Sequence, residues 1–208
     1  MSNYKKKIID LYNKRFQDSS ISNYKKLGWG SKKSQDLRFK IIINRWDLRN
    51  SRILDIGCGF GDFYNFLKKN NIRTKFYTGL DINENFISHC KKKFKNIKQI
   101  EFILSDFINY KIDKKFDFIF FSGTYNLKIS NNYREVSKII TKMYESSING
   151  CSFNLLSNYV DYKNSKDFHY NVSKIFDISK KISPYVSLLH DYKLYEFTIN
   201  IRKNQYEY

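Results

Sequence analysis

Three glycines at alternate positions, Gly57, Gly59 and Gly61, stand between an apolar run and a segment with helical spacing. Glycine permits a tight turn and lets the backbone approach a ligand, because no Cβ stands in the way. The helix that follows would present free N–H groups to a polar or anionic ligand. The loop departs from the nicotinamide-binding pattern GxGxxG, because the position of its third glycine is occupied here by Asp62. The phosphate-binding pattern GK[ST] is also absent from this loop.

Two aspartates each follow an apolar run further along the chain. Asp81 comes 20 positions after Gly61, and a carboxylate at the tip of a second strand can accept hydrogen bonds from both hydroxyls of a ribose. Asp106 and Phe107 follow the next run. There a side chain can hydrogen-bond an adenine amino group while the phenylalanine packs against the base. Either aspartate could instead simply cap a helix.

A fourth feature is the predicted strand 116–122, FDFIFFS, which ends in two small residues, Ser122 and Gly123. The four features follow one another in order, each at the carboxyl end of a predicted strand. Ligands of open α/β sheets bind at those ends. The order therefore predicts one ligand site at one edge of a sheet.

The elements that must position these residues alternate between strand and helix patterns. Such alternation predicts a mainly parallel sheet with helices on both faces. The last two strands are joined by only four residues, which permits an antiparallel pair alone. The predicted strands are 52–56, 75–80, 100–104, 116–122, 151–157, 185–190 and 195–202, and the predicted helices are 3–18, 31–46, 62–69, 83–93, 132–146 and 172–182.

The motifs resemble those of class I S-adenosylmethionine-dependent methyltransferases. ILDIGCGFG resembles their first motif, GLDI the second, SDF the third and FDFIFFSG the fourth. The resemblance implies a Rossmann-like fold with a seven-stranded, mostly parallel sheet that closes with an antiparallel hairpin, and S-adenosyl-L-methionine as cofactor. The glycine loop would pass along the methionine portion, and Asp55 would orient that loop. Ribose, adenine and the sulfonium would meet the later motifs, so the implied cofactor residues are Asp55, Gly57, Cys58, Gly59, Gly61, Asp81, Ile82, Asp106, Phe107, Ser122 and Gly123.

Residues 1–49 are expected to form a helical cap over the bound cofactor, and residues 50–208 the methyltransferase core. In several small-molecule methyltransferases the segment ahead of the core folds over the cofactor. Arg38 is a candidate for the methionine carboxylate, because a guanidinium pairs bidentately with a carboxylate. The alternative is a solvated arginine on a helix. Tyr24, Trp29 and Gln35 are further candidates for the same cap.

The acceptor is less clearly indicated. The [DNS]PP[YFW] motif of amino-methylating DNA enzymes and the Pro-Cys of cytosine-5 enzymes are both absent. A hydroxyl or a protonated amine would need a base, and the candidate catalytic residues are His190, which is next to Asp191, His169 and Tyr125. Each histidine could equally be a solvated or packing residue. No residues are predicted to bind a metal.

The composition is basic, with a formal charge of +18. The chain has 30 lysines but eight arginines and no alanine, a combination that an A+T-rich coding sequence would produce. The charge is therefore discounted as evidence for a polyanionic partner, and nucleic acid stays possible but is not favoured. Three cysteines without a CxxC pair, and no apolar run long enough to span a membrane, predict a cytoplasmic protein with no membrane partner.

The sequence thus favours methyl transfer to an O or N atom of a small metabolite. An RNA- or protein-directed methyltransferase, or a binding subunit that uses a basic surface, is the alternative. A contiguous band of lysines around the pocket would favour nucleic acid. The oligomeric state is not indicated.

Overall fold

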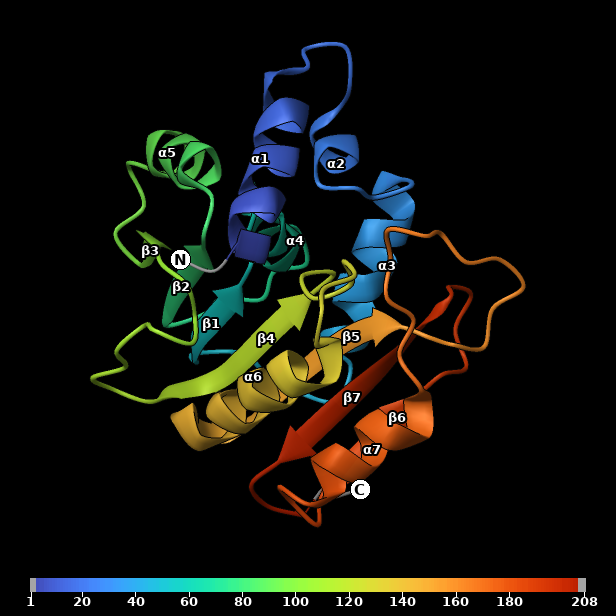
Figure 1. Ribbon diagram of the computed structural model, residues 1–208. Coiled ribbons are helices and arrows are strands. Elements are labelled where there is room, and N and C mark those ends of the chain that lie inside the picture. Colours follow the sequence, from blue (N-terminus) through green and yellow to red (C-terminus); the bar gives the residue numbers. More distant parts are fainter. Residues whose placement is uncertain (1–2, 206–208) are drawn as a thin grey trace.

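A seven-stranded sheet forms the centre of the molecule in the computed structural model, which describes residues 3–205 (Figure 1). The strands are β1 (Arg52–Ile56), β2 (Phe76–Asp81), β3 (Ile100–Leu104), β4 (Phe116–Ser122), β5 (Ser147–Leu156), β6 (Val186–Leu189) and β7 (Glu196–Arg202). Their order across the sheet is β3-β2-β1-β4-β5-β7-β6. The first five are parallel, and β7 runs antiparallel to both β5 and β6. The predicted Rossmann-like sheet with its closing hairpin is confirmed.

Helices cover both faces of this sheet. The helices are α1 (Asn3–Gln17), α2 (Asn23–Lys26), α3 (Lys32–Ile43), α4 (Asp62–Lys69), α5 (Glu84–Lys93), α6 (Asn132–Ser146) and α7 (Val172–Lys180). The apolar sides of α3, α4 and α5 pack into one buried cluster with one face of the sheet. The apolar sides of α6 and α7 pack into a second cluster on the other face.

The residues of β1 show how the sequence serves both faces. Ile53 belongs to the cluster under α3, α4 and α5, and Leu54 belongs to the cluster under α6 and α7. Successive side chains of a strand point to opposite faces, so a strand buried on both sides reads as a continuous apolar run. Asp55 interrupts the run and is itself buried, so its carboxyl needs a partner inside the protein.

Several element boundaries differ from the sequence prediction. β5 begins at Ser147 and not at residue 151, because Gly150 continues the strand with a φ of 148°. The short helix α2 lies within the predicted loop 19–31. The second predicted helix begins as expected, since Ser31 caps it through the amide of Ser34, but it ends at Ile43. The hairpin strands are each shorter than predicted.

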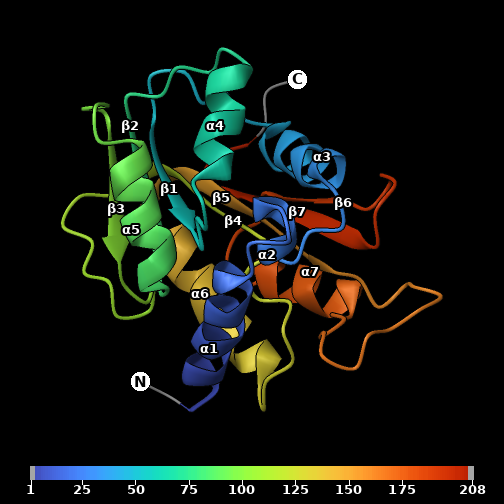
Figure 2. The same ribbon diagram turned by 90° about the horizontal axis from the view of Figure 1, so that it is seen from above.

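The N-terminal helices lie at the edge of the sheet where the parallel strands end. Figure 1 shows α1 and α2 beyond the arrowheads of β1 and β4, and Figure 2 shows α1 in front of the sheet when the molecule is viewed from above. The predicted cap (residues 1–49) and core (residues 50–208) include residues 1–2 and 206–208. These five residues lie outside the described residues. Within residues 3–205, no helix is long and apolar enough to cross a membrane.

Candidate functional site

A cavity lies at the carboxyl ends of β1, β2, β3 and β4, under helix α1. The strand ends supply its floor, and α1 with the segment that precedes α3 supplies its cover. Most of the side chains in the cover are apolar. The residues that line the cavity include Ile56, Gly57, Gly59, Asp81, Ile82, Asn83, Ser105, Asp106, Phe107, Ser122, Gly123, Thr124 and Tyr125 in the floor, and Tyr4, Lys5, Ile8, Ile9, Tyr12, Leu27 and Trp29 in the cover.

The glycine loop has the backbone that its sequence suggests. Gly57, Gly59 and Gly61 have φ values of 73°, 52° and 71°, in the left-handed region that favours glycine. A Cβ on Gly57 would overlap the side chain of Thr124. Gly61 is the residue that directly precedes α4. The loop therefore brings bare backbone to the cavity just before a helix begins.

Asp81 is fixed in the cavity wall by backbone amides. Its Oδ2 accepts a hydrogen bond from the amide of Gly59 at 3.0 Å, and its Oδ1 accepts one from the amide of Asn83 at 2.9 Å. Burial raises the pKa of the Asp81 carboxyl to about 6, although the amide hydrogen bonds act in the opposite direction. Asp81 thus contributes to the cavity wall a carboxylate that two backbone amides hold in place.

Asp55 in β1 and Cys58 in the glycine loop are both buried and are not among the residues that line the cavity. The hydroxyl of Tyr77 donates a hydrogen bond to Oδ2 of Asp55 at 2.5 Å. Burial raises the pKa of the Asp55 carboxyl to about 7 and also raises the pKa of the Cys58 thiol. The role predicted for Asp55, to orient the loop, stays a prediction. Cys58 is a buried, protonated thiol.

Asp106 connects the floor of the cavity to its cover. Its Oδ1 accepts a hydrogen bond from the amide of Ile108 at 3.2 Å, and its Oδ2 pairs with the ammonium of Lys5 on α1. On the same helix, the hydroxyl of Tyr4 donates a hydrogen bond to Glu135 at 3.0 Å. Helix α1 is therefore held on the cavity by polar contacts to two different parts of the core.

The end of β4 is fixed by its neighbours in the sheet. Oδ1 of Asn154, on β5, accepts a hydrogen bond from the amide of Gly123 at 3.1 Å. The amide group of Asn154 also donates to Oγ of Ser122 at 3.0 Å. The hydroxyl of Thr124, two residues after β4 ends, donates to the carbonyl oxygen of Ile56 at the end of β1 at 3.0 Å. Ser122 and Gly123 thus have a defined position in the cavity floor.

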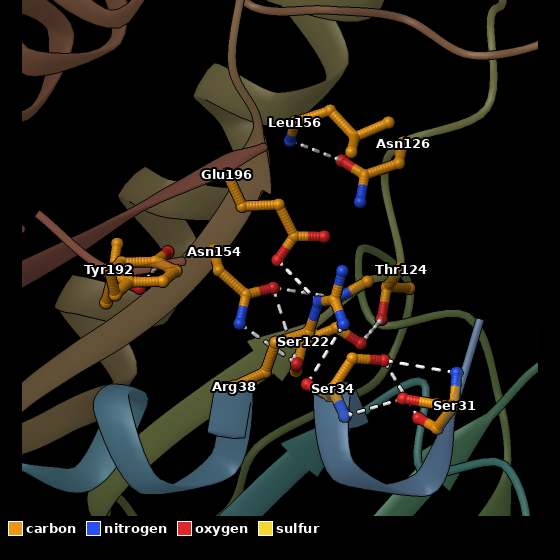
Figure 3. A network of polar contacts seen from close by, with 12 residues as sticks. Ser31, Ser34, Arg38, Ser122, Thr124, Asn126, Asn154, Leu156, Tyr192 and Glu196 are labelled. Carbon is orange, nitrogen blue, oxygen red and sulfur yellow. Dashed lines mark hydrogen bonds and ion pairs between the residues drawn. The ribbon is translucent and has the colours of Figure 1, made fainter. Parts of the chain in front are cut away.

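The structure places Arg38 differently from the sequence prediction. Arg38 does not line the cavity. Its Nε donates to Oε2 of the buried Glu196 at 2.6 Å, and its Nη1 donates to the carbonyl oxygen of Ser34 at 3.0 Å (Figure 3). A buried carboxylate needs a partner that replaces its lost hydration, and Glu196 takes the guanidinium that was predicted to meet a ligand carboxylate. Arg38 therefore serves an internal ion pair.

The two candidate histidines lie away from the cavity lining. His190 follows β6, the outermost strand on its side of the sheet, and is exposed, with its ring against those of Tyr159 and Phe197. This corrects the prediction that His190 faces the pocket, since β7 lies between β6 and the parallel strands. Nδ1 of His169 lies 2.8 Å from the carbonyl oxygen of Ser157, to which it donates a hydrogen bond in the tautomer that carries the hydrogen on Nδ1.

Tyr125 is the one candidate catalytic residue that the structure places in the cavity wall. Burial, together with nearby acidic groups such as Asp106, raises the pKa of its hydroxyl well above the usual range. The phenol therefore keeps its proton at neutral pH. In that state Tyr125 can donate a hydrogen bond but does not act as a phenolate base.

Several residues of the site were not singled out from the sequence. Lys5, Tyr4 and Glu135 join the cover to the floor. Asn154 fixes the end of β4, and its signal was a buried polar residue between the apolar residues Phe153 and Leu155. Glu196 gave no such signal, because a glutamate near the start of a hairpin strand is commonly exposed to solvent. Among residues 3–205, no cluster of His, Cys, Asp or Glu has the arrangement of a metal site.

Taken together, the cavity offers bare glycine backbone, one rigid carboxylate at the end of β2 and a second at the end of β3. These groups match an elongated ligand with hydroxyls near Asp81 and an amino group near Asp106. No residue in the wall is arranged as an activated nucleophile with its own base. The site is therefore suited to positioning a ligand that brings its own reactive group.

Comparison with known proteins gives a consistent result. Residues 53–146 match the family model described as "Methyltransferase domain". The chain is 31% identical over 158 residues to the Mycobacterium tuberculosis protein named "Putative methyltransferase Rv1506c", and the match covers 73% of this chain and 92% of that protein.

Two solved structures share the fold. The N-methyltransferase NodS from Bradyrhizobium japonicum, in complex with S-adenosyl-L-homocysteine, has a TM-score of 0.66 at 12% identity, over 93% of this chain and 97% of its own. The magnesium protoporphyrin IX methyltransferase from Synechocystis, with bound S-adenosylhomocysteine, has a TM-score of 0.64 at 12% identity, over 95% and 94%. At this identity the likeness shows a common architecture.

Proposed function

Because the chain belongs to the class I S-adenosylmethionine-dependent methyltransferases, we propose that it moves a methyl group from S-adenosylmethionine to an oxygen or nitrogen atom of a small molecule. The observation that supports a small-molecule acceptor is the cover over the cavity. Tyr4, Lys5, Ile8, Ile9 and Tyr12 of α1 all line the cavity. A group presented by a folded RNA or protein would have to displace this helix, whereas a small molecule needs only to fit beneath it.

The residues present fit the cofactor. Gly57 and Gly123 line the cavity together with Thr124 and Trp29, the side chains that a Cβ on either glycine would overlap, so backbone forms part of the wall here. Asp81 would accept hydrogen bonds from the ribose hydroxyls, with Ile82 beside it. Asp106 and Phe107 would hold the adenine, and Gly57, Gly59 and Gly61 would pass along the methionine portion.

When bound, S-adenosylmethionine supplies a methyl group that its sulfonium has already activated. The protein then contributes mainly by positioning, since a well-oriented pair of reactants gains a large effective concentration. Ser122 and Gly123, held by Asn154, would define the place of the sulfonium. Tyr125, which keeps its proton, would orient an acceptor oxygen or nitrogen atom through a hydrogen bond.

The helix α1 has a specific part in this proposal. Lys5 pairs with Asp106, the residue that would hold the adenine. The ammonium of Lys5 and the amino group of adenine would therefore compete for, or share, one carboxylate. Binding of the cofactor should loosen the Lys5 contact and change how tightly α1 lies on the cavity.

The test combines binding and transfer. Calorimetry with S-adenosylmethionine and with S-adenosylhomocysteine should show binding of both, and absence of binding by either would defeat the cofactor assignment. Transfer of a radiolabelled methyl group should then be followed into separated small-molecule, RNA and protein fractions of a cell extract. Label in the small-molecule fraction supports the proposal. Label confined to RNA or protein would refute the acceptor class and leave the methyltransferase activity intact.

A further inference from the structure

The segment before α3 packs against two glycines of the site. A Cβ on Gly59 would come within 2.8 Å of Cδ2 of Leu27, and a Cβ on Gly123 would overlap Cη2 of Trp29. Both Leu27 and Trp29 line the cavity. The indole therefore lies directly on the end of β4, where no side chain separates it from the backbone.

Arg38 packs against this indole. Its Cζ lies 4.7 Å from the centre of the Trp29 ring, a distance at which a guanidinium is attracted to the aromatic face. The planar guanidinium can stack in this way, and lysine cannot reproduce that geometry. Arg38 is in turn fixed by Glu196 at 2.6 Å and by the carbonyl oxygen of Ser34 at 3.0 Å.

The ion pair is well shielded from water. The Arg38 side chain is 12% exposed and the Glu196 side chain 2% exposed. Glu196 is the first residue of β7 and lies opposite Leu156, the last residue of β5. Because β7 is antiparallel, it begins at the edge where β4 and β5 end, and Figure 3 shows Arg38 and Glu196 directed toward one another beside Ser122 and Asn154. The Arg38–Glu196 pair thus links the site to β7, which is not one of the four strands that form the cavity floor.

We infer that Trp29 is the aromatic wall against which the sulfur end of the bound cofactor lies, and that Arg38 and Glu196 are positioning residues that hold its indole there. This rests on the proposed function, which places Ser122 and Gly123 beside the sulfur. A fixed indole at Gly123 excludes water from the reacting centre and limits the directions from which an acceptor approaches. Arg38 then acts on the ligand only through Trp29.

The chain contains two tryptophans, so the inference can be tested by fluorescence. Trp46 donates a hydrogen bond to Asn200 and packs on Phe118, on the face under α3. A Trp46→Phe protein keeps an aromatic ring there and leaves Trp29 as the single tryptophan. Titration with S-adenosylhomocysteine should change the emission of Trp29, with a midpoint that equals the Kd from calorimetry.

The positioning pair is tested in the same background. Glu196→Gln should shift the emission of the unliganded protein to longer wavelength, because the loosened indole meets water, and should weaken S-adenosylhomocysteine binding at least threefold. Arg38→Lys, which keeps the charge but loses the stacking, should give the same emission shift. The matched control is Asp47→Asn, which breaks an exposed ion pair with Arg49 and should change neither quantity.

A double-mutant cycle separates positioning from general structural support. If Glu196 acts through Trp29, then Glu196→Gln should cost little further affinity in a Trp29→Leu protein. Full additivity, or an unchanged Trp29 emission on binding, would overturn the inference while the cofactor assignment stands. If Glu196→Gln does not fold, Arg38→Lys and Trp29→Leu carry the same cycle. Failure of the unsubstituted protein to bind S-adenosylhomocysteine in calorimetry would instead refute the proposed function.

Discussion

The amide of Gly59 donates a hydrogen bond to Oδ2 of Asp81 at 3.0 Å, so the glycine loop after β1 and the carboxylate at the end of β2 are parts of one rigid unit. The second oxygen of Asp81 is held by the amide of Asn83. Neither amide contact needs to form when a ligand arrives. The site is therefore pre-organised at the position proposed for the ribose, which lowers the ordering cost of binding.

Replacement of Asp81 by asparagine should weaken S-adenosylhomocysteine binding by at least tenfold. Hydrogen bonds to a charged group contribute about 1.5–3 kcal/mol each, and the variant loses the charge while it keeps the shape. Calorimetry measures the effect. Asp113→Asn, at an exposed ion pair with Lys111, is the control and should bind as the unsubstituted protein does. Equal affinity in the Asp81 variant would mean that the carboxylate only supports the loop.

Binding should also depend on pH, because the pKa of Asp81 is raised to about 6 by burial. Above pH 6 the carboxyl is ionised and accepts hydrogen bonds from the ligand. As the pH falls through 6 it becomes protonated, and the affinity should then fall by up to about tenfold per pH unit, since only the ionised form binds well. Calorimetry at pH 8, 7, 6 and 5 tests this. The Asp81→Asn protein should show no such step, whereas persistence of the step there would assign it to another group.

Gly123→Ala should weaken S-adenosylhomocysteine binding at least tenfold. The new Cβ overlaps the ring of Trp29, and the φ of 71° at this position is strained for any residue with a side chain. Gly30→Ala is the matched control, because a Cβ there has no neighbour within 4 Å. Calorimetry and thermal unfolding of both proteins separate loss of binding from loss of stability. Wild-type affinity in the Gly123 variant would show that the indole can move without consequence.

Gly150→Ala should lower the thermal stability without touching the cavity. Gly150 has a φ of 148°, and a Cβ there would overlap the carbonyl oxygen of Ile201 on the neighbouring strand β7. The substitution should cost more than about 1 kcal/mol, which corresponds to roughly 2–4 °C in Tm for a chain of this size. Differential scanning calorimetry measures the change. An unchanged Tm would mean that the two strands separate at little cost.

The parts of the site that could be predicted are those in which the local backbone or the end of a strand requires a particular type of residue. Glycine at positions 57 and 59 is required by the backbone itself, and Asp81 follows a strand whose end must lie at the ligand edge. These inferences need only the order of elements. The predicted alternation of strands and helices was sufficient for the fold, because short apolar strands separated by helices are buried in a single sheet that helices cover on both faces.

The parts that could not be predicted depend on which strand neighbours which. Arg38 was predicted to meet the ligand because a guanidinium pairs with a carboxylate, and His190 because it is next to Asp191 between the hairpin strands. The sheet order β5-β7-β6 places Glu196 beside Arg38 and moves His190 outward. The predicted strand 151–157 left out Gly150, and the close approach of β7 explains why a glycine continues the strand there. Such relations are fixed by tertiary packing and leave no local pattern.

The Arg38–Glu196 pair also sets an order of events during synthesis. The two residues are 158 positions apart, and at about 5–20 residues per second a ribosome needs roughly 8–30 s to reach the second after the first. During that interval every glycine and aspartate of the cavity is translated, while Arg38 still lacks its partner Glu196. The wall at Gly123 can be completed only when β7 has been translated and inserted between β5 and β6. Cofactor that binds while the chain is still on the ribosome would therefore meet an incomplete site. A complete site is present only in a chain whose last strand, β7, has folded.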